Sequence, residues 1–152
     1  MVLAANAAWG GDRVCDGALG AVAVDGNVTV PAGGACMLQS TRVAGNVQVA
    51  SGARLIANGA RVGGNIQADD ARRVVVLSGT WVDGNIQVKQ SGLVRVEGAR
   101  VGGDVQLVDN TGVVVVKDNR VAGNLQCKSN HRAPNGGGNR VSGNKEDQCR
   151  SL

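Results

Sequence analysis

Short apolar segments alternate with small and polar residues along most of the chain, and a Gly-Asn step marks their repeat. The step recurs at nearly constant spacing, with aspartate replacing asparagine once, at Gly26-Asn27, Gly45-Asn46, Gly64-Asn65, Gly84-Asn85, Gly103-Asp104, Gly123-Asn124 and Gly143-Asn144. The longer unit reads Arg-Val-x-Gly-Asn-(Val/Ile/Leu)-Gln, as at residues 61–67. A repeat of this length indicates a solenoid in which each copy forms one coil.

A second apolar segment lies between successive Gly-Asn steps, at residues 54–57, 74–77, 93–96 and 113–116. Its period of two is typical of strands. Because a unit this short has no room for a crossover helix, equivalent strands must stack directly in parallel. The sequence therefore predicts an all-β, single-domain parallel β-helix of about seven rungs of 19–20 residues. We expect a right-handed coil, as in other parallel crossovers.

Stacking of equivalent positions about 4.8 Å apart predicts columns of side chains. Three apolar columns are expected to point inward: Val28, Val47, Ile66, Ile86, Val105 and Leu125; Val43, Val62, Val82, Val101, Val121 and Val141; and Leu55, Val75, Val94 and Val114. The asparagines are expected at a corner, bonded to one another and to the turn backbone. An outward column is expected to form a polar ladder, with a sugar-binding strip as the alternative, at Gln48, Gln67, Gln87, Gln106 and Gln126.

The four cysteines fall into two pairs. Cys15 and Cys36 are separated by slightly more than one repeat, and so are Cys127 and Cys149. Of the three connectivities that four cysteines allow, only the pairing of cysteines about one rung apart, on adjacent coils, fits the repeat. We therefore expect a disulfide at each end of the solenoid. Zinc is disfavoured, because there is no Cys-x-x-Cys and the chain has a single histidine, His131.

Composition points to an exported protein with a thin core. The chain has 24 glycines and neither phenylalanine nor tyrosine, so small aliphatic residues must fill the interior. Disulfides imply an oxidising compartment, and residues 1–9 resemble the end of a secretory signal, with an Ala-x-Ala-type site at residues 5–7. We expect a secreted or cell-surface protein with no membrane span. The net charge of +4 fits either an anionic partner or solubility alone.

A basic column is the first candidate for function. It lies three residues before each repeat glycine, at Arg42, Arg61, Trp81, Arg100, Arg120 and Arg140. Guanidinium groups at rung spacing would bind carboxylates or sulfates, and the indole would stack on a sugar or a base. The alternative is an exposed stripe that salt screens and that pairs with acids such as Asp83 or Asp118.

An aliphatic face is the second candidate. If Val75 and Leu77 point inward, Val74 and Val76 must point outward. This would leave an exposed patch through which the protein associates with itself, formed by Val74, Val76, Leu93, Val113 and Val115. The alternative is that the chain's own termini cover this patch.

No catalytic set is recognisable. Asp69, Asp70 and Asp109 are isolated in turns, and there is no Ser/His/Asp or Cys/His arrangement. Threonine ladders of the ice-binding type are also absent. We therefore expect a protein that is not an enzyme and needs no cofactor or metal.

The unit at residues 82–87, Val-Asp-Gly-Asn-Ile-Gln, resembles the rung of bactofilins, which are bacterial β-solenoids that polymerise end to end. The likeness extends over most of residues 26–149 and is greater still to exported bacterial solenoids with a paired-cysteine C-terminus. It implies the solenoid fold. Bactofilins, however, are cytoplasmic, lack such disulfides and leave their ends open.

Together these patterns predict three segments: residues 1–13 as a signal remnant or cap, 14–149 as the solenoid, and 150–152 as a tail. A polar loop at residues 128–139 and the charges of Lys145, Glu146 and Asp147 are expected to seal the C-terminal end. The leading hypothesis is a secreted structural protein that associates with itself. The alternative is a binding module for acidic polysaccharide or another polyanion, with nucleic acid disfavoured.

Overall fold

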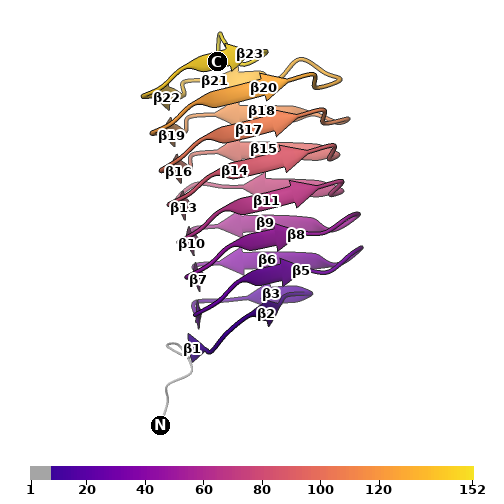
Figure 1. Ribbon diagram of the computed structural model, residues 1–152, viewed down its shortest axis with the longest axis vertical. Coiled ribbons are helices and arrows are strands. Elements are labelled where there is room, and N and C mark those ends of the chain that lie inside the picture. The colour runs from indigo at the N-terminus through magenta and orange to yellow at the C-terminus, as the bar shows by residue number, and fades with distance from the viewer. Residues whose placement is uncertain (1–7) are drawn as a thin grey trace.

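The chain winds into a parallel β-solenoid whose rungs rise from the N-terminal end to the C-terminal end (Figure 1). The computed structural model describes residues 8–152, and this part of the chain contains strands and turns but no helix. Each full rung gives one strand to each of three sheets, so the coil has three faces. We call the sheets, and the faces that they present to solvent, A, B and C.

Sheet A is built from two-residue strands: β1 (Ala8–Trp9), β4 (Ala23–Val24), β7 (Arg42–Val43), β10 (Arg61–Val62), β13 (Trp81–Val82), β16 (Arg100–Val101), β19 (Arg120–Val121) and β22 (Arg140–Val141). Sheet B contains β2 (Arg13–Val14), β5 (Val28–Val30), β8 (Val47–Val49), β11 (Ile66–Asp69), β14 (Ile86–Lys89), β17 (Val105–Val108), β20 (Leu125–Lys128) and β23 (Lys145–Asp147). Sheet C contains β3 (Gly17–Leu19), β6 (Ala35–Gln39), β9 (Arg54–Asn58), β12 (Arg73–Val76), β15 (Leu93–Glu97), β18 (Val114–Lys117) and β21 (Asn135–Gly137).

Two of the predicted inward columns are confirmed. The column from Val28 to Leu125 pairs in register through sheet B, and every member is fully buried. The column that begins at Val43 pairs in register through sheet A and is buried up to Val121, while Val141 at the last rung is partly buried. The stacked aliphatic side chains form one continuous core, as expected for a coil without large rings.

The third predicted column is wrong at one rung. Val74, and not Val75, pairs with Leu55 below it and Val94 above it. Val74 and Val76 are both 0% exposed and belong to the core. Val75 pairs with Ile56 and Arg95 on the outward side of sheet C and lies outside the core cluster, although neighbouring side chains leave it only 5% exposed.

The cause is the position of one additional residue. Ala57 pairs with Val76, and Arg61 pairs with Trp81. The separation in sequence from Arg61 to Trp81 is therefore one residue longer than that from Ala57 to Val76. The longer rung therefore takes up its additional residue after β12, in the corner at residues 77–80. A shift of one residue turns every side chain of a strand to the opposite face. Because four apolar residues follow one another here, periodicity could not reveal the shift.

The Gly-Asn steps form the corner between sheets A and B, where one ladder of hydrogen bonds climbs the solenoid. The side-chain oxygen of each asparagine accepts the backbone N–H of the equivalent residue one rung higher, at 2.7–2.9 Å, from Asn27 to Asn144. Asp104 serves equally well, because only the oxygen is used. A Cβ on Gly84 would lie 2.8 Å from the carbonyl oxygen of Gly64, so the step requires glycine.

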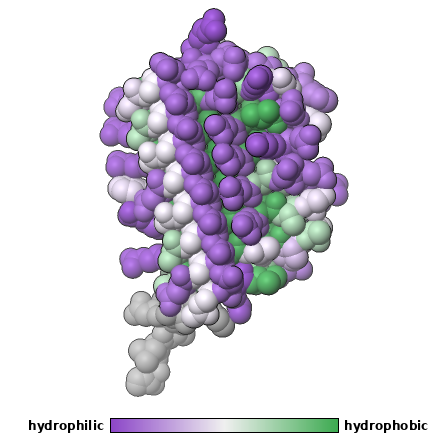
Figure 2. Space-filling view, viewed as in Figure 1, coloured by the Kyte–Doolittle hydropathy of each residue, from purple (hydrophilic) through white to green (hydrophobic). Residues whose placement is uncertain are grey.

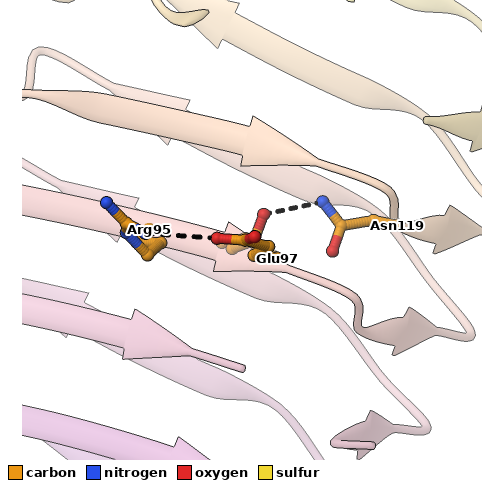
Figure 3. Close-up of polar contacts among 4 residues, drawn as sticks. Arg95, Glu97 and Asn119 are labelled. Carbon is orange, nitrogen blue, oxygen red and sulfur yellow. Dashed lines mark hydrogen bonds and ion pairs between the residues drawn. The ribbon is translucent and has the colours of Figure 1, made fainter. Parts of the chain in front are cut away.

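Two further asparagine ladders lie inside the upper half of the coil. Asn119 and Asn139 are buried at the corner between sheets C and A, and Asn110 and Asn130 at the corner between sheets B and C. Their amide nitrogens donate to core-strand carbonyls, for example from Asn119 Nδ2 to Val96 O at 2.8 Å (Figure 3). The repeat could have revealed Asn119 and Asn139, because each of them directly precedes a member of the arginine column.

The C-terminal end differs in part from the prediction. The segment 128–139, predicted as a polar loop, includes β21, which pairs with β18 through its backbone although it lacks apolar side chains. Lys145, Glu146 and Asp147 lie in the edge strand β23 as expected. Beyond them the chain turns over the end of the coil, and Leu152 packs against the core. At the other end β1 pairs with β4, while the predictions for residues 1–7 lie outside the described residues.

Candidate functional site

The arginine column runs up face A in a single line. Neighbouring members pair in register through the two-residue strands, so one side chain from each rung points outward while the valine beside it points into the core. All the members are exposed: Arg42, Arg61, Trp81, Arg100, Arg120 and Arg140. The structure thus brings together every residue that the sequence predicted for this column. Five steps of about 4.8 Å give the column a length of about 24 Å.

Small residues border the column at every rung except that of Asp83, so its side chains stand out as a ridge. The position two residues after each column member is occupied by Ala44, Gly63, Asp83, Gly102, Ala122 and Ser142. On this side, a shallow hollow of about 310 Å³ lies between Arg120, Arg140 and Ser142. On the other side, a second hollow of about 320 Å³ is lined by residues that include Ser40, Gly79 and Trp81. A chain-like ligand could therefore lie against either flank of the ridge.

Trp81 is not a free stacking platform. The guanidinium carbon of Arg61, one rung below, lies 4.8 Å from the centre of the indole, and that of Arg100, one rung above, also lies 4.8 Å away. These cation–π contacts take up both ring faces and hold the two arginines in place. The residue as a whole remains 40% exposed. The prediction that a sugar or base stacks on Trp81 would require an arginine to leave.

Most of the column has no ion-pair partner within residues 8–152. Arg61 is paired with Asp83 at 3.3 Å, as predicted, but the two side chains are 54% and 50% exposed. Exposed pairs of this kind contribute little, about 0–1 kcal/mol. Asp118 lines a hollow with Arg120 and Arg140 but forms no salt bridge with either. Four guanidinium groups, those of Arg42, Arg100, Arg120 and Arg140, therefore face solvent without a carboxylate partner in the described chain.

Face B carries the glutamine ladder. Gln67 donates to Gln87 at 3.3 Å, and Gln87 donates to Gln106 at 2.8 Å. Figure 2 views this face, and hydrophilic side chains run along it in columns parallel to the long axis. A shallow hollow of about 460 Å³ lies over the lower part of the ladder, with Asp69 and Lys89 at its margin. The predicted polar ladder is confirmed, and its charges are mixed.

Face C lacks the patch that the sequence predicted. Val74 and Val76 were expected to meet another molecule, but both point into the core, so this part of the prediction is wrong. Leu93, Val113 and Val115 are half-buried on the outward side, where Met37 is 41% exposed. Charged side chains interrupt them, including the Arg95–Glu97 pair at 3.2 Å (Figure 3). The apolar surface is therefore smaller and more divided than predicted.

The cysteines form the two predicted disulfides, each joining adjacent rungs. Cys15 is bonded to Cys36 and Cys127 to Cys149, with Cα–Cα distances of 5.5 and 5.2 Å. Such bonds fit an oxidising compartment. In residues 8–152, no three His, Cys, Asp or Glu side chains are grouped so that they could hold a metal ion. No helix in the described chain is long and apolar enough to cross a membrane.

The fold and the surface define this protein as a disulfide-linked parallel β-solenoid with a basic ridge on one face. No protein-family model, curated protein or solved structure matches the chain. The resemblance to bactofilins therefore stays a prediction.

Proposed function

We propose that this protein is a non-catalytic, secreted solenoid that binds a linear polyanion along the arginine column of face A. The observation that carries the proposal is the in-register line of exposed guanidinium groups, four of which have no carboxylate partner in residues 8–152. The two disulfides support export, because such bonds persist in oxidising compartments.

Electrostatics favour an anionic partner for this ridge. Like charges at rung spacing repel one another by about 1 kcal/mol per neighbouring pair in water. A ligand with repeated negative groups would relieve this repulsion at several rungs at once, and each arginine can bind an oxyanion through two parallel hydrogen bonds. The strands that carry the column are already paired in register from rung to rung, so binding needs no rearrangement of the backbone.

Retention on a heparin column tests the proposal with a matched pair of triple variants. One removes Arg42, Arg120 and Arg140 from the ridge, and the other removes the exposed Arg54, Arg73 and Arg95 from face C, each by substitution with alanine. Both variants lower the net charge from +4 to +1. We expect the ridge variant to elute at clearly lower salt than the face C variant. Equal elution of the two would show that net charge alone causes retention, and would refute the proposal.

Self-association remains a second candidate because face C keeps some apolar surface. Met37 is exposed, and Ile56, Leu93 and Val115 are half-buried on its outward side. Light scattering over a range of concentrations tests this function. A mass that rises with concentration, and falls back when Met37 and Val115 become Ser and Thr, would support it. A monomer at every concentration would exclude it.

A further inference from the structure

We infer that the ligand of the arginine column is an extended polyuronate, a polysaccharide with one carboxylate on each sugar, that lies parallel to the solenoid axis. This inference rests on the proposed function and specifies its ligand. It depends on three features of face A: the spacing of the ridge, the shape of its flanks, and the state of Trp81.

The spacing of the ridge suits a chain with one charge for each sugar. The column presents one outward side chain per rung, at intervals of about 4.8 Å. A pyranose ring in an extended chain is about as long as this interval. A polyuronate lying along the ridge would therefore keep its carboxylates in step with the arginines from Arg42 to Arg140. The long arginine side chains can reach carboxylates on either side of the sugar chain.

The flanks of the ridge leave space for sugar rings. Small residues border it on one side at every rung except that of Asp83. Between the arginines, the shallow hollows are lined by Ser40, Gly59 and Gly79 on one flank and by Ala122, Ser142 and valines on the other. A ring with several hydroxyl groups can lie there without displacing a bulky side chain. The hydroxyl of Ser142 and that of Ser40 offer polar contacts, one on each flank.

Trp81 argues against single-stranded nucleic acid. Proteins that bind such strands combine a basic groove with aromatic faces on which bases stack. Trp81 is the one tryptophan whose side chain the structure describes. Arg61 and Arg100 cover both faces of its indole.

Substitution of Asp83 tests the inference through an expected gain in affinity. Its carboxylate lies 3.3 Å from Arg61 and competes with a ligand carboxylate for that guanidinium group. The substitution Asp83→Asn removes the carboxylate that pairs with Arg61, with almost no change in shape. We expect it to tighten binding of the polyuronate about twofold to fivefold, the range that an exposed ion pair accounts for.

Titration calorimetry with oligogalacturonates of increasing length tests the inference. We expect affinity to rise with the length of the oligomer and to level off at about six sugars, the number that spans the column. The fully methyl-esterified oligomers, which keep the sugar chain without its charge, should not bind. Oligothymidylate with the same number of charges should bind more weakly than the oligogalacturonate.

The outcomes separate the ligand class from the proposed function. Equal or tighter binding of oligothymidylate would overturn the inference while leaving a polyanion-binding ridge in place. Affinity that keeps rising well beyond six sugars would also overturn it, since it would indicate unspecific attraction. If neither polymer binds and heparin is not retained, the proposed function itself fails.

Discussion

The corner asparagines between sheets A and B act mainly through one atom, the side-chain oxygen, although the amide nitrogen of Asn27 also donates to Asp12. That oxygen accepts the backbone N–H of the equivalent residue one rung higher, and Asp104 shows that a carboxylate can take the same place. The corner thus selects for an acceptor of the right length and not for an amide. The glycine before it is required for a different reason, because the backbone below leaves no room for a Cβ.

This division of roles predicts the effect of two substitutions. Asn65→Ala removes the acceptor for the backbone N–H of Asn85, which lies 2.7 Å away in a partly buried site. The loss should lower the free energy of unfolding by about 1–2 kcal/mol. Asp104→Asn keeps the acceptor and should change stability by less than about 0.5 kcal/mol. Urea unfolding of both variants checks the prediction, and equal effects would contradict it.

The strands of sheet C show what the element pattern can and cannot predict. The repeat alone was enough for the parallel stacking, two of the three inward columns and both disulfides, because each depends only on equivalent positions lying one above another. The orientation of β12 was not predictable, because its run of valines has no alternation and the additional residue of that rung lies after the strand. The same error produced the predicted patch at Val74 and Val76.

The candidate site on face A was predictable for a related reason. The arginines stand at a constant distance before each repeat glycine, so the register alone places them in one line. What the sequence could not predict was the state of Trp81. Whether an indole stacks on a ligand or between its own neighbours depends on side-chain conformation, which no repeat encodes.

A pair of substitutions in β12 tests the orientation of this strand. Val74→Thr places a hydroxyl in the apolar core, which costs about 1–3 kcal/mol when the hydroxyl finds no partner. Val75→Thr places the same group on the outward side, outside the core cluster and beside Arg95, so the loss should be smaller. Comparison of the two thermal midpoints decides the orientation. A larger loss for Val75→Thr would restore the arrangement predicted from the sequence.

The whole molecule is a stack in which each rung contacts mainly the rungs above and below it. Stability in such a protein spreads from neighbour to neighbour, and the terminal rungs, which have one neighbour, are the weakest. The disulfides lie at these two ends, one joining Cys15 to Cys36 and the other Cys127 to Cys149. Their position indicates that they prevent fraying of the terminal rungs.

Removal of one disulfide should therefore have a local effect. The double variant Cys127→Ala, Cys149→Ala should lose about 2–4 kcal/mol of stability. Hydrogen exchange should accelerate first in β22 and β23 and only later in the middle strands such as β11 and β14. Uniform acceleration throughout the solenoid would contradict this account of the ends.

The central claim concerns face A of the whole solenoid, and the arginine side chains report on it directly. Nuclear magnetic resonance of the Nε–Hε groups during titration with an oligogalacturonate distinguishes the arginines of face A from those of face C in one experiment. We predict progressive shifts along the column, for Arg42, Arg61, Arg100, Arg120 and Arg140, and for the indole N–H of Trp81, with little change at Arg54, Arg73 and Arg95 of face C. Equal shifts on both faces, or none on face A, would contradict a binding ridge.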